Sequence, residues 1–218
     1  IYNDLNPDLH NTYYAANTFG SAPLGAEVRQ TIYGFNRPDA FGNTVLIKYR
    51  IFNRSASAWT NAYLGMWADP DVGNAGDDRL GSDVARNTGY VYNAQPTDTA
   101  YGSNPPAAGF VYLKGPGAGK PLSTFSYFVN GGSITDPNNQ YQVYNHLRGV
   151  WRDGSTMYDP STGQPTTYAY SGDPVNNTGW VDYDNPADVR IVLGSGPVNL
   201  AAGDSVDLDF AVVIGQGG

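Results

Sequence analysis

The sequence predicts an all-β fold: an antiparallel β-sandwich of jelly-roll type with long loops and one short inserted helix. Three observations support this class. Several segments alternate apolar and polar residues with the period of two that a half-buried strand shows. Asp-Pro and Asn-Pro pairs separate these segments, and proline ends strands because it lacks a backbone donor. Only one segment has helical periodicity, and one short helix among many strands does not suit an α/β fold.

The clearest strand is Thr44–Asn53, in which Val45, Ile47, Tyr49 and Ile51 face one side and mixed residues face the other. A Gly-containing hairpin is expected at 158–168. The remaining expected strands are Glu27–Asn36, Ala58–Ala68, Gly89–Asn93, Gly109–Leu113, Thr124–Asn130, Thr166–Tyr170, Val189–Leu193 and Val206–Ile214.

The helical segment is Gln140–Trp151, where large apolar residues recur at spacings of three and four. Asp136 or Asn138 is expected to cap its start, and Asp153-Gly154 to form its exit turn. No linker, charge block or repeat divides the chain. We therefore expect a single domain over 1–218, with a polar N-terminal arm at 1–22 and a helix-bearing loop at 136–154.

Composition excludes several classes of protein. Twelve Lys and Arg against 20 Asp and Glu give a net charge of −8, and nucleic-acid binders carry a basic surface instead. Apolar content of 40% is enough for a folded core. No apolar run is long enough to insert into a membrane. With zero Cys there is no disulfide framework, thiolate zinc site or cysteine nucleophile.

The segment Trp67–Asn93 is rich in oxygen ligands and predicts a calcium site. Calcium takes six to eight hard oxygen ligands in flexible geometry, and a bound cation relieves the repulsion among clustered carboxylates. The loop is not an EF-hand, because from Asp69 the fifth position is Gly73 and the twelfth is Leu80. The expected ligands are Asp69, Asp71, Asn74, Asp77, Asp78 and Asp83.

A solvated acidic turn is the alternative interpretation of this loop, with Arg79 and Arg86 neutralising part of its charge. Magnesium suits the loop less well than calcium, because Mg²⁺ keeps several waters and takes few protein ligands.

The same segment carries a longer pattern, W-x-D-P-D-x-G-x-A-G-D-D-x-x-G-x-D followed by G-Y-x-Y-N. Further pieces follow in order at 128–131 (FVNG), 144–149 (YNHLRG), 171–174 (SGDP) and 195–197 (SGP). Together they resemble an uncharacterised secreted β-sandwich domain of Ignavibacteria- and Bacteroidota-type surface proteins. The resemblance implies an extracellular, cell-surface location, and it does not imply an activity. Relatives often have Cys where this chain has Ser82.

Catalytic motifs are missing from the sequence. There is neither a G-x-S-x-G elbow nor an H-E-x-x-H zinc signature, and both His10 and His146 are expected to be structural or surface residues. An Asp-based glycoside hydrolase is the third-ranked function, because Glu27 is the only glutamate and any acid pair must be two aspartates.

The sequence therefore predicts a non-catalytic extracellular structural or adhesive component. It would be a calcium-stabilised surface module or a subunit of a filament or sheath. Partners would be further copies or neighbouring modules, joined by strand addition through Val206–Ile214 or Ile1–Phe19. The alternative is a carbohydrate-binding module that uses aromatic side chains to stack on sugars. The candidates for stacking are Tyr13, Tyr14, Tyr90, Tyr92, Tyr101 and Tyr112.

Overall fold

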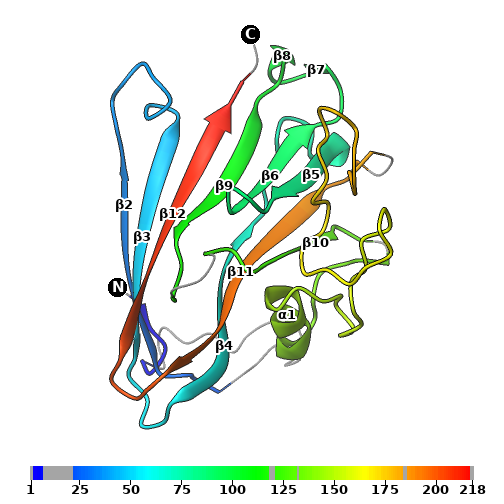
Figure 1. The fold of residues 1–218 in the computed structure, drawn as a ribbon. Helices are drawn as coiled ribbons and strands as arrows, with labels where there is room; N and C mark the ends of the chain where they lie inside the picture. Colours follow the sequence, from blue (N-terminus) through cyan, green and yellow to red (C-terminus); the bar gives the residue numbers. More distant parts are fainter. Residues whose placement is uncertain (1, 7–21, 118–120, 132, 184–185, 217–218) are drawn as a thin grey trace.

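The computed structural model describes residues 2–6, 22–117, 121–131, 133–183 and 186–216. Within these ranges the chain forms two antiparallel sheets that pack against each other, with one helix on the outer side of the smaller sheet (Figure 1). The predicted all-β sandwich is confirmed. Among the described residues, no helix has the length and apolar character needed to cross a membrane.

The larger sheet has seven strands in the order β1-β2-β3-β12-β9-β6-β5. β12 lies inside this sheet, paired with β3 on one side and β9 on the other. Its strands are β1 (Tyr2–Asn3), β2 (Ala26–Gly34), β3 (Thr44–Asn53), β5 (Asp78–Asp83), β6 (Thr88–Asn93), β9 (Ala107–Lys114) and β12 (Ser205–Gly215).

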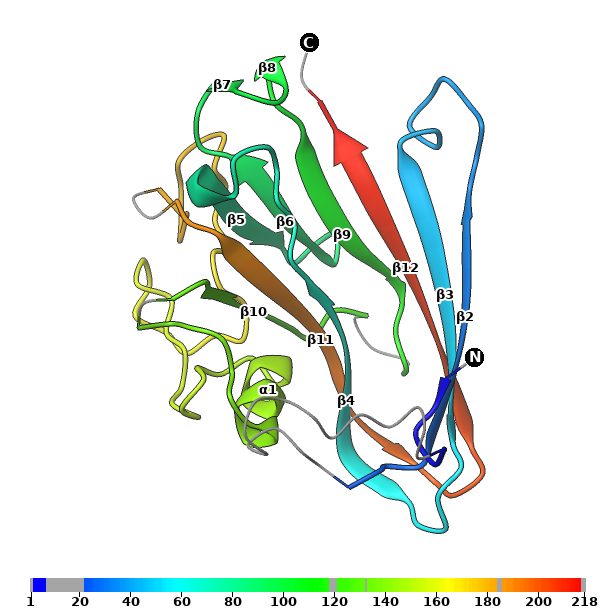
Figure 2. The same cartoon turned by 180° about the vertical axis from the view of Figure 1, so that it is seen from behind.

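The smaller sheet has three strands in the order β10-β11-β4, where β10 is Thr124–Val129, β11 is Val189–Leu200 and β4 is Trp59–Ala68. A separate two-stranded ribbon joins β7 (Thr97–Asp98) to β8 (Gly102–Ser103). From behind, β2 and β3 lie at the side of the larger sheet away from β10 and the helix (Figure 2).

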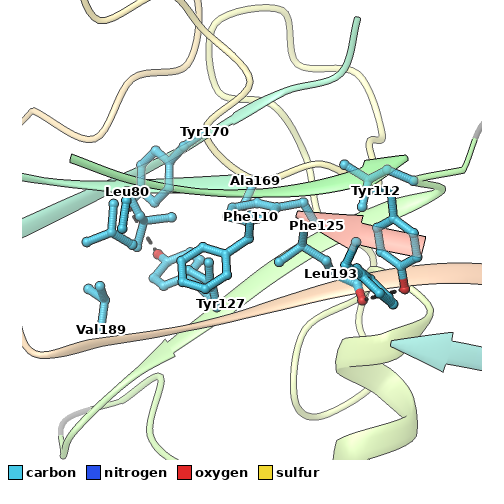
Figure 3. Close-up of a cluster of buried hydrophobic side chains, with 14 of the residues drawn as sticks. Leu80, Phe110, Tyr112, Phe125, Tyr127, Ala169, Tyr170, Val189 and Leu193 are labelled. Carbon is cyan, nitrogen blue, oxygen red and sulfur yellow. Dashed lines mark hydrogen bonds between the residues drawn. The ribbon is translucent and has the colours of Figure 1, made fainter. Parts of the chain in front are cut away.

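The core lies between the sheets (Figure 3). Phe125 and Leu193 are fully buried there, because alternate residues of β10 and β11 face the larger sheet. Polar tips of buried aromatic residues find partners inside the core. The Tyr112 hydroxyl donates to the Leu64 carbonyl at 2.8 Å, and the hydroxyls of Tyr127 and Tyr170 lie 3.2 Å apart.

Most expected strands are present, with three corrections. β5 was not predicted, because its short sequence contains two Asp and one Gly and has no clean alternation. Thr166–Tyr170 is not a strand; it makes only an isolated bridge from Tyr168 to Phe125. The hairpin expected at 158–168 is likewise reduced to one bridge, from Tyr158 to Pro165.

Helix α1 covers Gln140–Leu147 and is shorter than predicted. Asn139, rather than Asp136 or Asn138, caps its start by accepting a hydrogen bond from the Gln142 amide. The chain leaves the helix at Gly149, whose φ of 73° favours glycine, well before the predicted Asp153-Gly154 turn.

Two glycines allow α1 to pack closely on the smaller sheet. A Cβ on Gly65 would lie 2.2 Å from Leu147 Cδ2, and one on Gly194 would lie 2.1 Å from the Leu147 carbonyl oxygen. Thr124 Oγ1 donates to that carbonyl at 2.7 Å, and the Tyr144 hydroxyl donates to the Asn61 carbonyl at 2.8 Å. The helix is therefore fixed against β4, β10 and β11.

The predicted N-terminal arm at 1–22 falls mostly on residues outside the described ranges, and so does His10. Within the described part, Tyr2 and Asn3 form β1 against β2. The carboxylate of Asp4 accepts hydrogen bonds from the amides of Leu24 and Ala26. The start of the chain is therefore tied to the beginning of β2.

Candidate functional site

Three carboxylates gather where β4 ends and β11 begins. Asp69 follows β4 directly and Asp188 precedes β11 directly. The two strands are antiparallel with Ile191 opposite Ala68, so continuing this register puts Asp71 opposite Asp188. Oxygens of Asp69, Asp71 and Asp188 all lie within 4.8 Å of one another. We call these three residues the acidic cluster.

Arg190 partly neutralises the acidic cluster. Its guanidinium lies 3.2 Å from Asp69 Oδ2 and 2.7 Å from Asp188 Oδ1, and its side chain is largely buried. Asn130 donates to the other oxygen of Asp188 at 2.9 Å. Partial burial raises the pKa of Asp69, while the charge of Arg190 opposes that shift. Three carboxylates against one guanidinium leave negative charge at this end of the small sheet.

Asp78 lies close enough to the cluster for the charges of Asp71 and Asp188 to act on it. The residue is 1% exposed, and its Oδ2 accepts a hydrogen bond from the Val72 amide at 3.0 Å. Its Oδ1 is buried without a hydrogen-bond partner among the described residues. Burial raises the pKa of Asp78 to about 7, and the neighbouring carboxylates add to this effect.

The six predicted calcium ligands do not come together as one set. Asp83 ends β5, opposite the end that Asp78 begins, and its carboxylate pairs with Arg86. Asn74 accepts a hydrogen bond from the Gly76 amide and so caps the 3₁₀ helix η2 (Ala75–Asp77). Asp77 accepts from the Asn93 side chain at 3.2 Å. Only Asp69 and Asp71 of the predicted set belong to the acidic cluster.

Asp188 was missed because it lies more than a hundred residues along the chain from Asp71. Nothing in its local sequence marks it as a ligand. The signal that identifies it is the pairing of β4 with β11, and strand pairing is not visible in one sequence.

A cavity of about 560 Å³ lies beside the acidic cluster, between α1 and the outer face of the smaller sheet. Its lining is mostly apolar. Trp67 at its rim is 57% exposed, whereas His146 is 1% exposed. The lining residues are Gly65, Trp67, Phe128, Asp136, Pro137, Val143, His146, Leu147 and Val192.

The hydrogen bonds of Ser126 fix the tautomer of His146. The Ser126 hydroxyl donates its one proton to the His146 carbonyl at 2.9 Å. The contact of 3.3 Å between Ser126 Oγ and His146 Nδ1 must then use the proton on Nδ1. Nε2 is left as a lone-pair acceptor, and it is buried with no partner among the described residues.

His146 is neutral at physiological pH, because burial lowers its pKa to about 4 and the charge of Arg152 adds to the shift. The pair of Ser126 and His146 does not have the geometry of a nucleophile and its base. Ser126 is fully buried and its proton already goes to a backbone carbonyl. His146 is therefore a buried, neutral side chain that lines the cavity.

The tyrosines expected to stack on sugars do not form one platform in the described residues. Tyr112 is buried in the core, and Tyr13 and Tyr14 lie outside the described ranges. Tyr90 and Tyr92 contact each other with ring centroids 6.0 Å apart. The exposed aromatic residue that borders a cavity is Trp67 instead.

No protein-family model matches this chain, and no curated protein matches it either.

Proposed function

We propose that this protein is a non-catalytic, extracellular structural or adhesive module that associates with a second copy of itself through the edge strand β2. The observation that supports the proposal is the open edge of β2. β1 pairs only with Glu27 and Val28, so the stretch from Arg29 to Gly34 has no strand partner on that side among the described residues. An edge of this kind is a template for another strand.

The backbone direction at this edge follows from two hydrogen bonds. The Gly25 carbonyl accepts a hydrogen bond from the Arg54 amide on the side of β3. The Ala26 carbonyl accepts one from the Asp4 amide on the side of β1. Because the direction alternates along a strand, Gln30, Ile32 and Gly34 present their N–H and C=O groups to the open edge.

If two copies are related by a two-fold axis at Ile32, all of these N–H and C=O groups can form hydrogen bonds between the copies. Ile32 then lies opposite its own counterpart, and Gln30 lies opposite Gly34 of the second copy. Each such pair exchanges two N–H···O bonds, and the inner faces of both sheets lie on one side. Such a contact is isologous and closed, so it forms a dimer.

Apolar side chains around the edge also favour association. Ile32 is 56% exposed and its neighbour Val45 on β3 is 43% exposed, although both belong to the sheet face that carries the core. The three strands of the smaller sheet leave this part of the face uncovered. An exposed aromatic row runs from Tyr33 at the end of β2 into the following turn, with ring centroids 6.1 Å apart for Tyr33 and Phe35 and 5.7 Å apart for Phe35 and Phe41. Exposed apolar patches of this kind mark interaction surfaces.

The strand proposed here for pairing differs from the two segments that the sequence suggested. The segment Val206–Ile214 was expected to offer a terminal strand, but it forms β12, an inner strand that pairs with β3 along Ser205–Val213 and with β9 along Asp209–Gly215. The other predicted segment, Ile1–Phe19, lies mostly outside the described residues. β2 takes the place of both in the proposal.

We further propose that calcium stabilises the module at the acidic cluster. Asp69, Asp71 and Asp188 provide hard oxygen ligands, and a divalent ion would offset the charge that Arg190 leaves uncompensated. Asp78 is a further carboxyl group near the acidic cluster, and its buried Oδ1 has no hydrogen-bond partner among the described residues. An extracellular location, where calcium is plentiful, agrees with this part of the proposal.

Ile32→Pro is expected to abolish self-association. The Ile32 N–H faces the open edge, so proline removes no hydrogen bond to β3 but blocks the new pairing. The control is Ile32→Thr, which keeps the donor and the β-branched shape. Sedimentation equilibrium should show the parent and the threonine variant as dimers at concentrations where the proline variant is a folded monomer.

Two outcomes would contradict the proposal. One is a parent protein that stays monomeric up to millimolar concentration, because even a weak contact of about 4 kcal/mol would be detected there. The other is a proline variant that dimerises as well as the threonine variant, since the contact would then lie elsewhere.

A further inference from the structure

We infer that the cavity between α1 and the smaller sheet binds a neutral sugar residue of a glycan. This site is on the outer face of the smaller sheet, whereas the β2 edge belongs to the larger sheet. The inference does not depend on the assembly proposed above. The cavity volume of about 560 Å³ lies in the range of small-molecule sites, and its mixture of apolar walls and few polar groups is typical of them.

Trp67 supplies an aromatic platform at the rim. It lies on β4 opposite Val192 of β11, and Val192 lies opposite Ser126 of β10, so these residues form one row across the sheet. The indole is 57% exposed although apolar residues surround its base. A large exposed tryptophan beside a cavity is a binding feature, because its flat face can pack against the C–H groups of a pyranose ring.

The polar groups of the cavity call for hydroxyl donors. His146 offers a buried Nε2 that accepts a hydrogen bond and has no partner among the described residues. Asp136 offers a carboxylate, which only accepts when ionised. The indole of Trp67 adds an N–H donor to the cavity. A sugar presents several hydroxyls that donate and accept, next to an apolar face, and so matches all three groups.

The charge near the cavity selects against acidic sugars. Asp136 belongs to the lining, and the acidic cluster lies next to it, since the charges of Asp136, Asp69 and Asp188 all act on Arg190. Arg190 already holds two carboxylates and lies outside the lining. A uronic or sialic acid would meet this negative field, and the described residues that line the cavity include no Lys or Arg.

The cavity is held in shape before a ligand arrives. Gly65 and Gly194 let Leu147 sit directly on the sheet, and the hydrogen bonds of Thr124 and Tyr144 fix the C-terminal half of α1. Arg152 Nε donates to Gln142 Oε1 at 2.9 Å and ties the following loop to the helix. A preformed site avoids the cost of ordering side chains on binding.

The test measures binding of defined probes by titration calorimetry. The neutral probes are cellotetraose, laminaritetraose, mannotetraose and chitotetraose; tetragalacturonate is the acidic probe and phenethylamine a cationic aromatic one. At least one neutral probe should bind with millimolar affinity or better, near 4 kcal/mol. Trp67→Ala should weaken that binding by about tenfold or more, since it removes the platform.

Two further variants make the test specific. Tyr141→Ala removes an exposed aromatic residue of α1 that does not line the cavity, and it should leave binding unchanged. His146→Phe keeps a ring and removes the Nε2 acceptor, and should weaken binding as well. If His146→Phe fails to fold, Trp67→Ala still decides the question, because its side chain is mostly exposed.

Three results would overturn the inference. These are no saturable binding of any neutral probe at about 10 mM, binding that Trp67→Ala and Tyr141→Ala affect equally, or a preference for tetragalacturonate or phenethylamine over every neutral probe. Loss of the β2 dimer in Ile32→Pro should not change sugar binding, so the two proposals fail separately.

Discussion

Gly194→Ala is expected to destabilise the protein by about 3 kcal/mol, at the upper end of the range for overpacked interiors. The new Cβ would lie 2.1 Å from the Leu147 carbonyl oxygen and 2.2 Å from Thr124 Oγ1. Neither atom can move freely, because these two groups are hydrogen-bonded to each other. The helix must shift away from the sheet, so the cavity is expected to lose its sugar affinity as well. Urea denaturation measures the free energy of unfolding directly.

Gly109→Ala is the matched control in the larger sheet. A Cβ at that position would have only ordinary contacts, at 3.7 Å from Thr88 Cγ2 and from the Val213 carbonyl. Its unfolding free energy should stay within about 1 kcal/mol of the parent, because alanine costs no space there. Equal losses in the two variants would show that α1 is not held through Gly194.

Removal of calcium is expected to lower the melting temperature of the protein. An ion that binds only the native state stabilises it by about 2.7 kcal/mol at a hundredfold excess over the dissociation constant. Melting curves recorded with excess calcium and with EDTA measure this difference. Asp71→Asn and Asp188→Asn should each reduce it, because each removes a charged ligand from the acidic cluster.

Asp83→Asn distinguishes the calcium ligands predicted from the sequence from those that the structure brings together. The sequence predicts Asp83 as a ligand, whereas the structure pairs it with Arg86 at the far end of β5. The variant should therefore keep the full calcium effect. A parent protein that melts identically in calcium and in EDTA would leave the acidic cluster as a solvated turn, with Arg190 as its counter-charge.

The strands that alternate cleanly could be predicted from the sequence. β3 begins and ends where its pattern of apolar residues does, at Thr44 and Asn53. Its inner residues Ile47, Tyr49 and Ile51 pack against the core as expected. Such strands are predictable because one buried face imposes a period of two on the residues themselves.

β5 and the acidic cluster were harder to predict, for a shared reason. β5 is buried by its neighbours β6 and the loop before β11 rather than by its own apolar pattern, since the Ala187 amide donates to the Asp78 carbonyl. Asp188 joins Asp69 and Asp71 only because β4 pairs with β11. Both features depend on which distant segments meet, and local sequence does not encode that directly.

The cavity illustrates the same point. Trp67 was recognised as a strand residue and His146 as a helix residue, and each prediction was right about the local element. Their approach to one cavity depends on α1 packing over Gly65 and Gly194. The open edge of β2 likewise follows from the strand order of the larger sheet, and the sequence pointed to β12 instead.

Amide hydrogen exchange along β2 tests most directly the claim that this edge joins two copies. Gln30, Ile32 and Gly34 present their amides to the open edge, whereas the amides of Arg29 and Tyr33 face β3. We expect the protection of the first three amides to rise with protein concentration, while that of the other two is high at every concentration. Fast exchange of Gln30, Ile32 and Gly34 at all concentrations would show that β2 stays unpaired and would contradict the proposed assembly.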